Sequence, residues 1–206
     1  MVNTSKGNRE KIFDTAVKLF AEKGYSNVSM REIAKVVGIK ASSIYNHYKG
    51  KEKILEEIFS YFKENVTSGI LKPLLNEDAE KYENPEKFLY ESLRTSMKIF
   101  DEPVMAGIIG IIRREQFVND RFGRFMSEIF IDTPISIFEE VFQKMMNKGL
   151  IKPMDARFLA EEYMSFSIYL FYKGTICKQD YNLEIADEER RLRRHVEFLW
   201  NNISIK

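Results

Sequence analysis

The segment from residue 40 to residue 51 concentrates side chains that can bond phosphates and the edges of bases. Lysine, serine, tyrosine, asparagine and histidine all donate to phosphate oxygens, and hydroxyls and amides also read base edges. A small side chain such as that of Ala41 lets a backbone approach DNA closely. The candidates for DNA contact, with two residues just upstream, are Ser29, Arg31, Lys40, Ala41, Ser42, Ser43, Tyr45, Asn46, His47 and Lys51.

The charge distribution along the chain also indicates an anionic partner at one end. The 206 residues carry a formal net charge of only +1. Residues 1–51 hold ten Lys or Arg against four Asp or Glu, whereas the remainder holds 22 against 27. The excess of positive charge is therefore confined to the N-terminal quarter, as expected where a protein meets a phosphate backbone.

Several other kinds of site are disfavoured by composition. Cys177 is the one cysteine, so no intrachain disulfide or thiolate metal cluster can form. The two histidines, His47 and His195, lie far apart, and no Glu-x-x-His pair, glycine-rich phosphate loop or traceable Ser-His-Asp set occurs. We therefore expect no catalytic residues, no metal and no cofactor. The N-terminus has no signal peptide and the apolar runs fall short of the ~20 residues of a membrane span, so we expect a cytoplasmic protein without a membrane partner.

Helical spacing of apolar residues recurs along almost the whole chain, and no stretch alternates with a period of two. We expect an all-α protein of about nine helices. The first covers residues 9–23, the second about 29–36 with a capping box from Ser29 to Glu32, and a short third about 40–47. Two short helices joined by a turn containing glycine form a helix-turn-helix, whose second helix enters the major groove of DNA.

Longer helices are predicted beyond Gly50. The fourth runs from about 51 to 72, and Asn84 with Pro85 starts the fifth. Later helices are expected at about 105–115, 119–148 with an interruption at Pro134, 155–178, and from 187 onward.

A run of residues at fixed spacings links the first helices. It reads Ile12-x3-Ala16-x2-Leu19-Phe20-x3-Gly24-Tyr25-x3-Ser29-Met30-Arg31-x-Ile33-Ala34-x3-Gly38-Ile39-x4-Ile44-Tyr45-x-His47-Tyr48-x2-Lys51-Glu52. This run closely resembles the N-terminal domain of the TetR family of repressors over residues 9–55. The resemblance implies a DNA-binding domain over 1–51 and an effector-binding and dimerisation domain over 52–206.

The resemblance also assigns roles to individual residues. It implies that Tyr45 bonds a phosphate through its hydroxyl, that His47 contacts the backbone or a base edge, and that Lys51 clamps a phosphate. Lys40 departs from the family, which usually places serine or another capping residue there. The residues alone leave alternatives open: Tyr45 could pack in the core, His47 could be a surface residue without a special role, and Lys40, Lys49 and Lys51 could form a solvated face.

The larger domain is rich in aromatic and methionine side chains at helical spacing. Such stripes are usually core, but tyrosine hydroxyls inside apolar helices also suit a pocket for a small, largely apolar effector. Arg113 could meet an acidic group of the effector or pair with Glu115 on the surface. The pocket candidates are Met97, Phe100, Ile109, Arg113, Phe125, Tyr163, Phe166 and Tyr169.

The last helix carries an apolar stripe, formed by Leu192, Val196, Leu199 and Trp200. By the family resemblance, this helix and the preceding one pair with their copies in a homodimer. The leading hypothesis is thus a ligand-responsive regulator, most simply a repressor, that binds palindromic double-stranded operator DNA as a dimer and is released by the effector. The alternatives are a constitutive architectural DNA-binding protein without an effector and an all-α enzyme.

Overall fold

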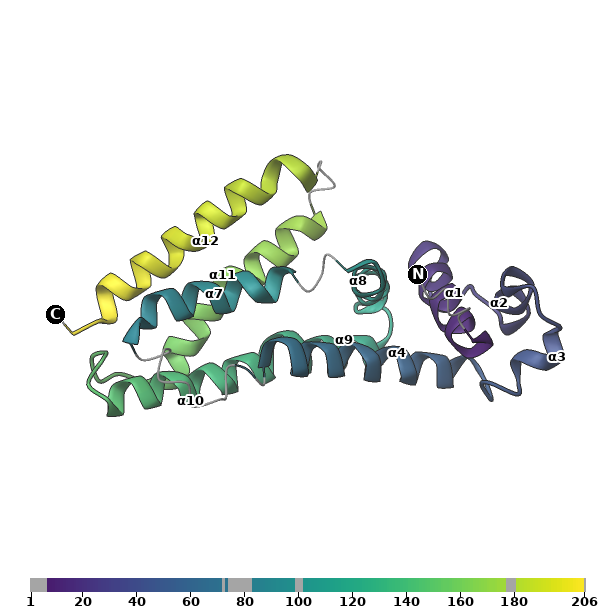
Figure 1. Cartoon of the computed structure of the whole chain (residues 1–206), viewed down its shortest axis with the longest axis horizontal. Helices are drawn as coiled ribbons and strands as arrows, with labels where there is room; N and C mark the ends of the chain where they lie inside the picture. Colours follow the sequence, from purple (N-terminus) through teal and green to yellow (C-terminus); the bar gives the residue numbers. More distant parts are fainter. Residues whose placement is uncertain (1–6, 72, 74–82, 99–101, 177–180, 206) are drawn as a thin grey trace, which may run out of the picture. The chain divides into compact units, whose positions relative to one another are not determined.

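The computed structural model describes residues 7–71, 73, 83–98, 102–176 and 181–205 (Figure 1). Every regular element in these ranges is a helix, which confirms the all-α prediction, and the only extended pairing among them is a single bridge between Ile151 and Ser204. The chain forms two compact units. The first unit consists of Met1–Asn65 and Phe100–Phe125, and the second of Val66–Ile99 and Met126–Lys206.

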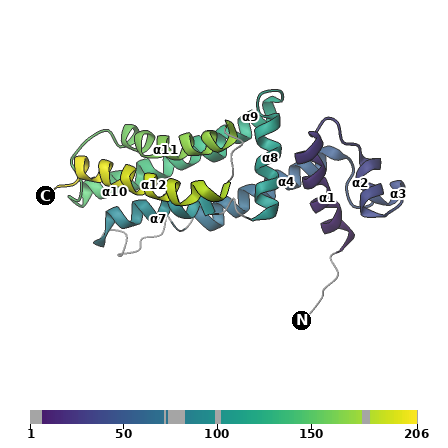
Figure 2. The same cartoon turned by 90° about the horizontal axis from the view of Figure 1, so that it is seen from above.

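The first unit combines the predicted helix-turn-helix and α4 with one later segment of the chain. Its helices are α1 (Asn8–Lys23), α2 (Met30–Val37), α3 (Ala41–Ile44), α4 (Lys51–Val66), α8 (Pro103–Glu115) and α9 (Asp120–Ser127). The last residue of α4 and the last two residues of α9 belong to the second unit. The helices α1 and α8 lie side by side in both views (Figure 1 and Figure 2). Phe59 of α4 stacks on Phe125 of α9, with ring centroids 4.1 Å apart and planes at 6°.

The ends of α2 follow the capping rules that the sequence predicts. The Ser29 side chain accepts the backbone N–H of Glu32 at 3.2 Å, which satisfies one of the free amides at the helix start. At the other end, Gly38 adopts a φ of +80°, and the Ile39 N–H bonds the Ala34 carbonyl at 3.0 Å. This left-handed closure reverses the chain within a few residues, and so sets the turn between α2 and α3.

The helix α3 is shorter than the predicted span of 40–47, because it ends at Ile44 and residues 45–47 form a turn. Lys40 occupies the N-cap without a side-chain hydrogen bond, as its departure from the family pattern implies. Ile44 is fully buried and anchors this single helical turn to the rest of the unit. Tertiary packing therefore holds α3 in place, since one turn is too short to be stable by itself.

The second unit is built mainly from long helices. Its elements are η1 (Thr67–Leu71), α7 (Pro85–Lys98), η3 (Glu128–Asp132), α10 (Thr133–Asn147), α11 (Ala156–Ile176) and α12 (Tyr181–Ile203). Figure 1 shows α12 running back alongside α11. Tyr163 of α11 lies at the centre, fully buried against Phe138 and Phe142 of α10. Its hydroxyl donates to the Leu89 carbonyl of α7 at 2.6 Å.

Some helix boundaries differ from those expected. The predicted helices over 51–72 and 119–148 each contain a π-helical segment, η1 and η3. Pro134 is the second residue of α10 and follows η3 directly, with Asp132 and Thr133 before it in the right-handed helical conformation. The helical path therefore continues through the predicted interruption, with the π-helical segment immediately before the proline. The last helix begins at Tyr181, six residues before the predicted start at the acidic stretch from 187. No helix in the described ranges has the length and hydropathy needed to cross a membrane.

Candidate DNA interface

The candidate interface is centred on α3, which is anchored from one side and exposed on the other. Ile44 and Tyr48 are buried at 0% and 2% exposure. The side chains that the sequence singles out on the opposite side are exposed, and these are Lys40, Ala41, Ser42, Tyr45 and Asn46, with Arg31 on α2. The major groove of DNA admits a helix, and small and polar residues on its exposed face can contact the edges of bases there.

The structure decides one of the open alternatives. Tyr45 is 45% exposed, so its ring is not a core residue, and its hydroxyl is free to face a phosphate. Ser43 and His47 are half-buried, and the His47 carbonyl accepts Arg9 Nη1 at 3.2 Å. Ser29 caps α2 with its side chain, which gives it a structural role whether or not it also meets DNA.

A cluster of three side chains ties α1 to α4 next to this face. The Arg9 guanidinium pairs with Glu57 of α4 and lies over the Tyr48 ring, 4.6 Å from its centroid. The Tyr48 hydroxyl donates to the same carboxylate at 2.9 Å. Burial, and then this hydrogen bond to a carboxylate, raise the pKa of Tyr48 above its ordinary value, so the phenol stays neutral.

Arg9, Tyr48 and Glu57 border an open hollow of about 440 Å³. The remaining lining residues are His47, Lys49, Lys53, Glu56 and Ser60. The carboxylates of Glu56 and Glu57 offset most of the positive charge of the lining, so we do not propose this hollow as an anion-binding site.

The ammonium of Lys51 points into the protein. Its Nζ donates to the carbonyls of Tyr25 and Val28 at 2.7 and 3.0 Å, with the Ser26 carbonyl at 3.4 Å. It also lies 4.4 Å from the centroid of the Tyr25 ring. Burial, and then the negative charge of Glu52, raise the pKa of Tyr25 to about 12. The phosphate contact expected of Lys51 stays a prediction, and it would compete with these internal acceptors.

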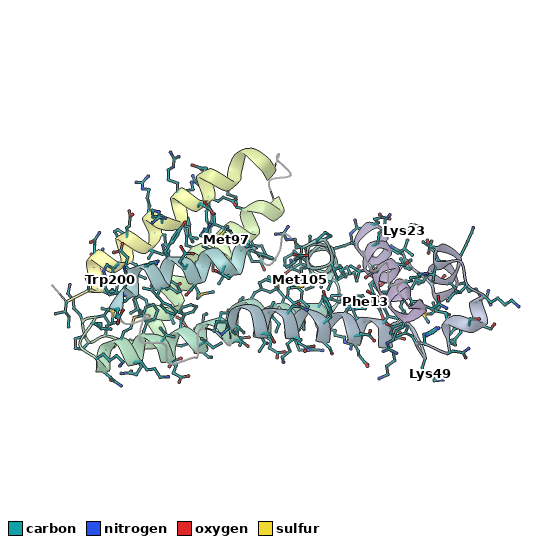
Figure 3. The ribbon with its side chains drawn as sticks, viewed as in Figure 1. Phe13, Lys23, Lys49, Met97, Met105 and Trp200 are labelled. Carbon is teal, nitrogen blue, oxygen red and sulfur yellow. The ribbon has the colours of Figure 1, made fainter. Side chains whose placement is uncertain are left out.

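Two further lysines next to α3 suit phosphate contact. Lys49 is exposed, and Figure 3 shows it at the turn between α3 and α4, pointing away from the ribbon. Lys53 is exposed too, although it pairs with Glu56 at 2.6 Å. Their position beside the motif was visible in the sequence. What the sequence did not reveal is which lysine of this stretch turns inward.

The match to known proteins covers the region that contains this interface. The sequence model of the family described as "Bacterial regulatory proteins, tetR family" matches residues 12–58, from α1 into α4. The chain belongs to the TetR family of transcriptional regulators. In this TetR-family regulator, the matched residues include every candidate for DNA contact that the sequence suggests.

The curated relatives of this TetR-family chain include one repressor from two staphylococci. The biofilm operon icaADBC HTH-type negative transcriptional regulator IcaR of Staphylococcus epidermidis is 45% identical over 58 residues, which cover 26% of this chain and 31% of the relative. The IcaR of Staphylococcus aureus is 26% identical over 148 residues, which cover 67% and 77%.

Solved structures of other regulators share the fold over most of the chain. A SmeT–triclosan complex has a TM-score of 0.73 at 14% identity and covers 98% of this chain and 93% of its own. A complex of AibR with isovaleryl coenzyme A and operator DNA has a TM-score of 0.58 at 20% identity and covers 81% and 86%. At these identities the likeness shows the fold alone.

The predicted effector residues of the regulator are divided between its two units. Ile109, Arg113 and Phe125 belong to the first unit, and Met97, Tyr163, Phe166 and Tyr169 to the second, while Phe100 lies outside the described residues. In the second unit the Tyr163 hydroxyl already donates its hydrogen bond to the Leu89 carbonyl. Their grouping into one pocket stays a prediction.

Two other predicted effector residues, Phe166 and Tyr169, contact the last helix and the solvent, respectively. Phe166 stacks on His195 of α12, with ring centroids 4.9 Å apart and planes at 16°. Burial lowers the pKa of His195 below its ordinary value, so the stacked ring is neutral near pH 7. Tyr169 is 49% exposed.

The predicted dimer residues of α12 differ in exposure. Leu192 and Val196 are buried within the chain itself, at 0% and 1% exposure, which leaves them almost no surface for a second copy. Leu199 and Trp200 are half-buried. Among residues 187–203 of this helix, the most exposed apolar side chain is that of Phe198, at 71%, which is not one of the predicted dimer residues.

Proposed function

We propose that this TetR-family regulator is a ligand-responsive repressor, which binds a palindromic double-stranded operator as a homodimer and is released by a small, largely apolar effector. The observation that carries the DNA-binding role is the exposed face of α3, with Lys40, Ala41 and Ser42 presented above the buried Ile44. Residues 1–51 would bind DNA, and residues 52–206 would bind the effector and form the dimer. A regulator that binds the chromosome works in the cytoplasm, and we propose that location.

The direction of regulation and the effector response are supported by the similar proteins. IcaR is a negative regulator by its description, SmeT forms a complex with triclosan, and AibR forms one with isovaleryl coenzyme A and operator DNA. We propose that the present chain also represses, and that it responds to a molecule with a large apolar part. These functions require binding alone, and we propose no catalysis.

The dimer is proposed on the outward face of α11 and α12. Phe158 of α11 is 59% exposed and Phe198 of α12 is 71% exposed, so both rings can contribute apolar surface to an interface. Tyr169 follows Phe158 by eleven residues, or three helical turns, and so lies on the same face. This face offers a second copy more apolar surface than the buried Leu192 and Val196 do.

The proposal is tested by selecting bound sequences from random duplex DNA with the full chain. A dimer places two recognition helices about 34–36 Å apart, one turn of B-DNA, so we expect a palindrome with half-sites at that spacing or a multiple of it. Recovery of no common sequence would contradict sequence-specific binding. Recovery of a single unpaired half-site would contradict the dimer geometry.

A further inference from the structure

One buried carboxylate holds the loop that leads into the helix-turn-helix. Glu115 is the last residue of α8 and is only 5% exposed. Its Oε1 accepts the backbone N–H of Tyr25 at 2.9 Å, across 90 residues of sequence. A buried carboxylate is costly to desolvate, so its position needs a reason beyond the filling of space.

The same loop is held from its other side by Lys51. The Tyr25 N–H is bonded by the Glu115 carboxylate, and the Tyr25 carbonyl is bonded by the Lys51 ammonium at 2.7 Å. Both bonds are charge-assisted, and such bonds are stronger than those between neutral groups. We call this pair of contacts the Tyr25 clamp. It fixes the loop between α1 and α2 from α8 on one side and from α4 on the other.

The surroundings of the clamp leave little room for another arrangement. Gly24 has a φ of +87°, and a Cβ there would lie 3.1 Å from Glu115 Oε1. Arg114, the neighbour of Glu115, donates to the Glu22 carbonyl at 3.0 Å. The Tyr25 ring meets the edge of Phe20 with centroids 5.1 Å apart. The end of α8 is therefore bonded to the end of α1 and to the following loop by two hydrogen bonds, Arg114 to Glu22 and Tyr25 to Glu115.

The clamp lies directly before the elements that would read DNA. Lys51 also bonds the Val28 carbonyl at 3.0 Å, and Ser29, the next residue, caps α2. The position at which α2 starts, and with it the turn into α3, thus depends on the loop from 25 to 28. Glu115 is too deeply buried to contact DNA itself, so any effect on DNA binding must pass through this loop.

We propose that Glu115 is a positioning residue for DNA binding, which holds the loop before the helix-turn-helix in its DNA-binding conformation through the Tyr25 amide. The proposal rests on the proposed function only in that the chain binds specific DNA. It gives α8 a direct connection to the recognition elements. Displacement of the α8 end would release the loop without any change in the residues that face DNA.

Three variants of the full chain separate positioning from charge and from general stability. Glu115→Met keeps the side-chain volume but removes the acceptor, and Glu115→Gln keeps an acceptor oxygen but removes the charge. Glu64→Gln is the matched control, because Glu64 is exposed on α4 and its substitution changes the net charge equally. Hydrogen exchange of the Tyr25 amide and binding to two duplexes, one recovered by selection and one unselected, are measured at several salt concentrations.

For Glu115→Met we expect faster exchange at Tyr25 and an affinity for the selected duplex about ten-fold lower, because the loop loses a charge-assisted bond. The salt slope should stay that of the parent, since no phosphate contact is lost. Binding of the unselected duplex should change by no more than about two-fold, because it depends on charge more than on geometry. Glu115→Gln should fall between parent and Glu115→Met, and Glu64→Gln should match the parent in exchange.

Parental affinity for the selected duplex in a folded Glu115→Met variant, with Tyr25 exchange accelerated, would overturn the proposal. Unchanged exchange at Tyr25 would overturn the clamp itself. If Glu115→Met does not fold, Glu115→Gln decides the question. Faster exchange at Tyr25 together with a loss of affinity for the selected duplex alone would support positioning, whereas parental affinity or equal losses for both duplexes would refute it. Failure of the parent to select any sequence would count against the proposed function, while the exchange result would still test the clamp.

Discussion

Two lysines two residues apart, Lys49 and Lys51, have different surroundings although both belong to the same basic stretch. Lys49 is exposed at the turn after α3 (Figure 3). Lys51 donates to backbone carbonyls of the loop from 25 to 28. An ammonium has three donors, and bonds to carbonyls leave few for a phosphate. At this position the geometry favours a structural role over the contact with DNA that the family resemblance implies.

The first prediction compares Lys51→Met with Lys49→Met. Lys51→Met should lower the free energy of unfolding by about 1–3 kcal/mol, because buried carbonyls lose their donor, and should leave the salt slope of DNA binding unchanged. Lys49→Met should have little effect on stability but should make the slope shallower by roughly 0.9, as expected for one lost phosphate contact. Denaturant unfolding and binding titrations at several salt concentrations measure both quantities. A shallower slope in Lys51→Met would restore its role as a phosphate clamp.

The sequence predicted which residue types form the candidate site, but it did not predict which partners their side chains contact. Tyr45, Ser42 and Lys40 are exposed, in agreement with a DNA-facing role inferred from residue type and spacing. Tyr163 was chosen for its hydroxyl, but that hydroxyl bonds the Leu89 carbonyl from another helix. Such a partner is distant in sequence, and local periodicity carries no information about it. The surface location suggested for Glu115 as a partner of Arg113 is wrong for the same reason, because Glu115 is buried and its carboxylate accepts the N–H of Tyr25, 90 residues away.

At the level of helices, the packing of α8 on α1 depends on two glycines in α8. A Cβ at Gly107 would lie 2.8 Å from Cγ1 of Val17, closer than real Cβ contacts. A Cβ at Gly110 would lie 3.7 Å from that of Ala21, which is ordinary contact. The two glycines are about one helical turn apart on α8. Substitutions at them form a matched pair that differs mainly in the room available for an added Cβ.

The second prediction follows from this pair. Alanine favours a helix over glycine by up to about 1 kcal/mol, whereas overpacking a core costs about 1–3 kcal/mol. Gly107→Ala should therefore destabilise the chain by about 1 kcal/mol, because Val17 is buried and its β-branched side chain is stiff. Gly110→Ala should be neutral or stabilising by up to about 1 kcal/mol. Equal effects of the two substitutions on the denaturation midpoint would contradict close packing at Gly107.

The order of helices was largely readable from the sequence, and the boundaries less so. Periodicity and caps predicted α1, α2 and the start of α7, where the Asn84 side chain accepts the Lys87 N–H at 3.1 Å. The π-helical segments η1 and η3 were not predicted, because such segments are rare single turns within longer helices and have no capping or breaking residues that mark them. The start of α12 at Tyr181 differs from the start predicted from the acidic run at 187–189, although Asp180, directly before Tyr181, is also a residue type that favours an N-cap.

At the scale of the whole molecule, the exposed apolar face of α11 and α12 carries the third prediction. Phe198→Asp should give a monomer at micromolar concentration by light scattering, because an unpaired charge buried in an interface costs several kcal/mol. Operator affinity should fall with it, since a monomer contacts only one half-site. Phe117→Asp is the control, because Phe117 lies between α8 and α9 and is 82% exposed. A dimeric Phe198→Asp variant would move the interface to another face.

The fourth prediction concerns the effector and the linkage between the two binding events. Hydrophobic compounds are screened by the rise in the thermal unfolding midpoint of the full chain, since a ligand that binds only the folded state stabilises it by mass action. Each hit is then titrated with and without the duplex recovered by selection. An effector that lowers operator affinity by a given factor must bind less tightly, by the same factor, when the operator is present.

Substitutions in the second unit then locate the site of any such hit. Phe166→Ala and Met97→Ala should weaken its binding by about ten-fold or more, because each removes a half-buried apolar side chain that a ligand could cover. Phe117→Ala, in the first unit, should leave hit affinity unchanged. A hit bound equally well with and without operator is no effector, since it does not distinguish the two states. Failure of every hit to show linkage would favour the alternative of a constitutive DNA-binding protein, because repression would then proceed without a ligand-driven shift.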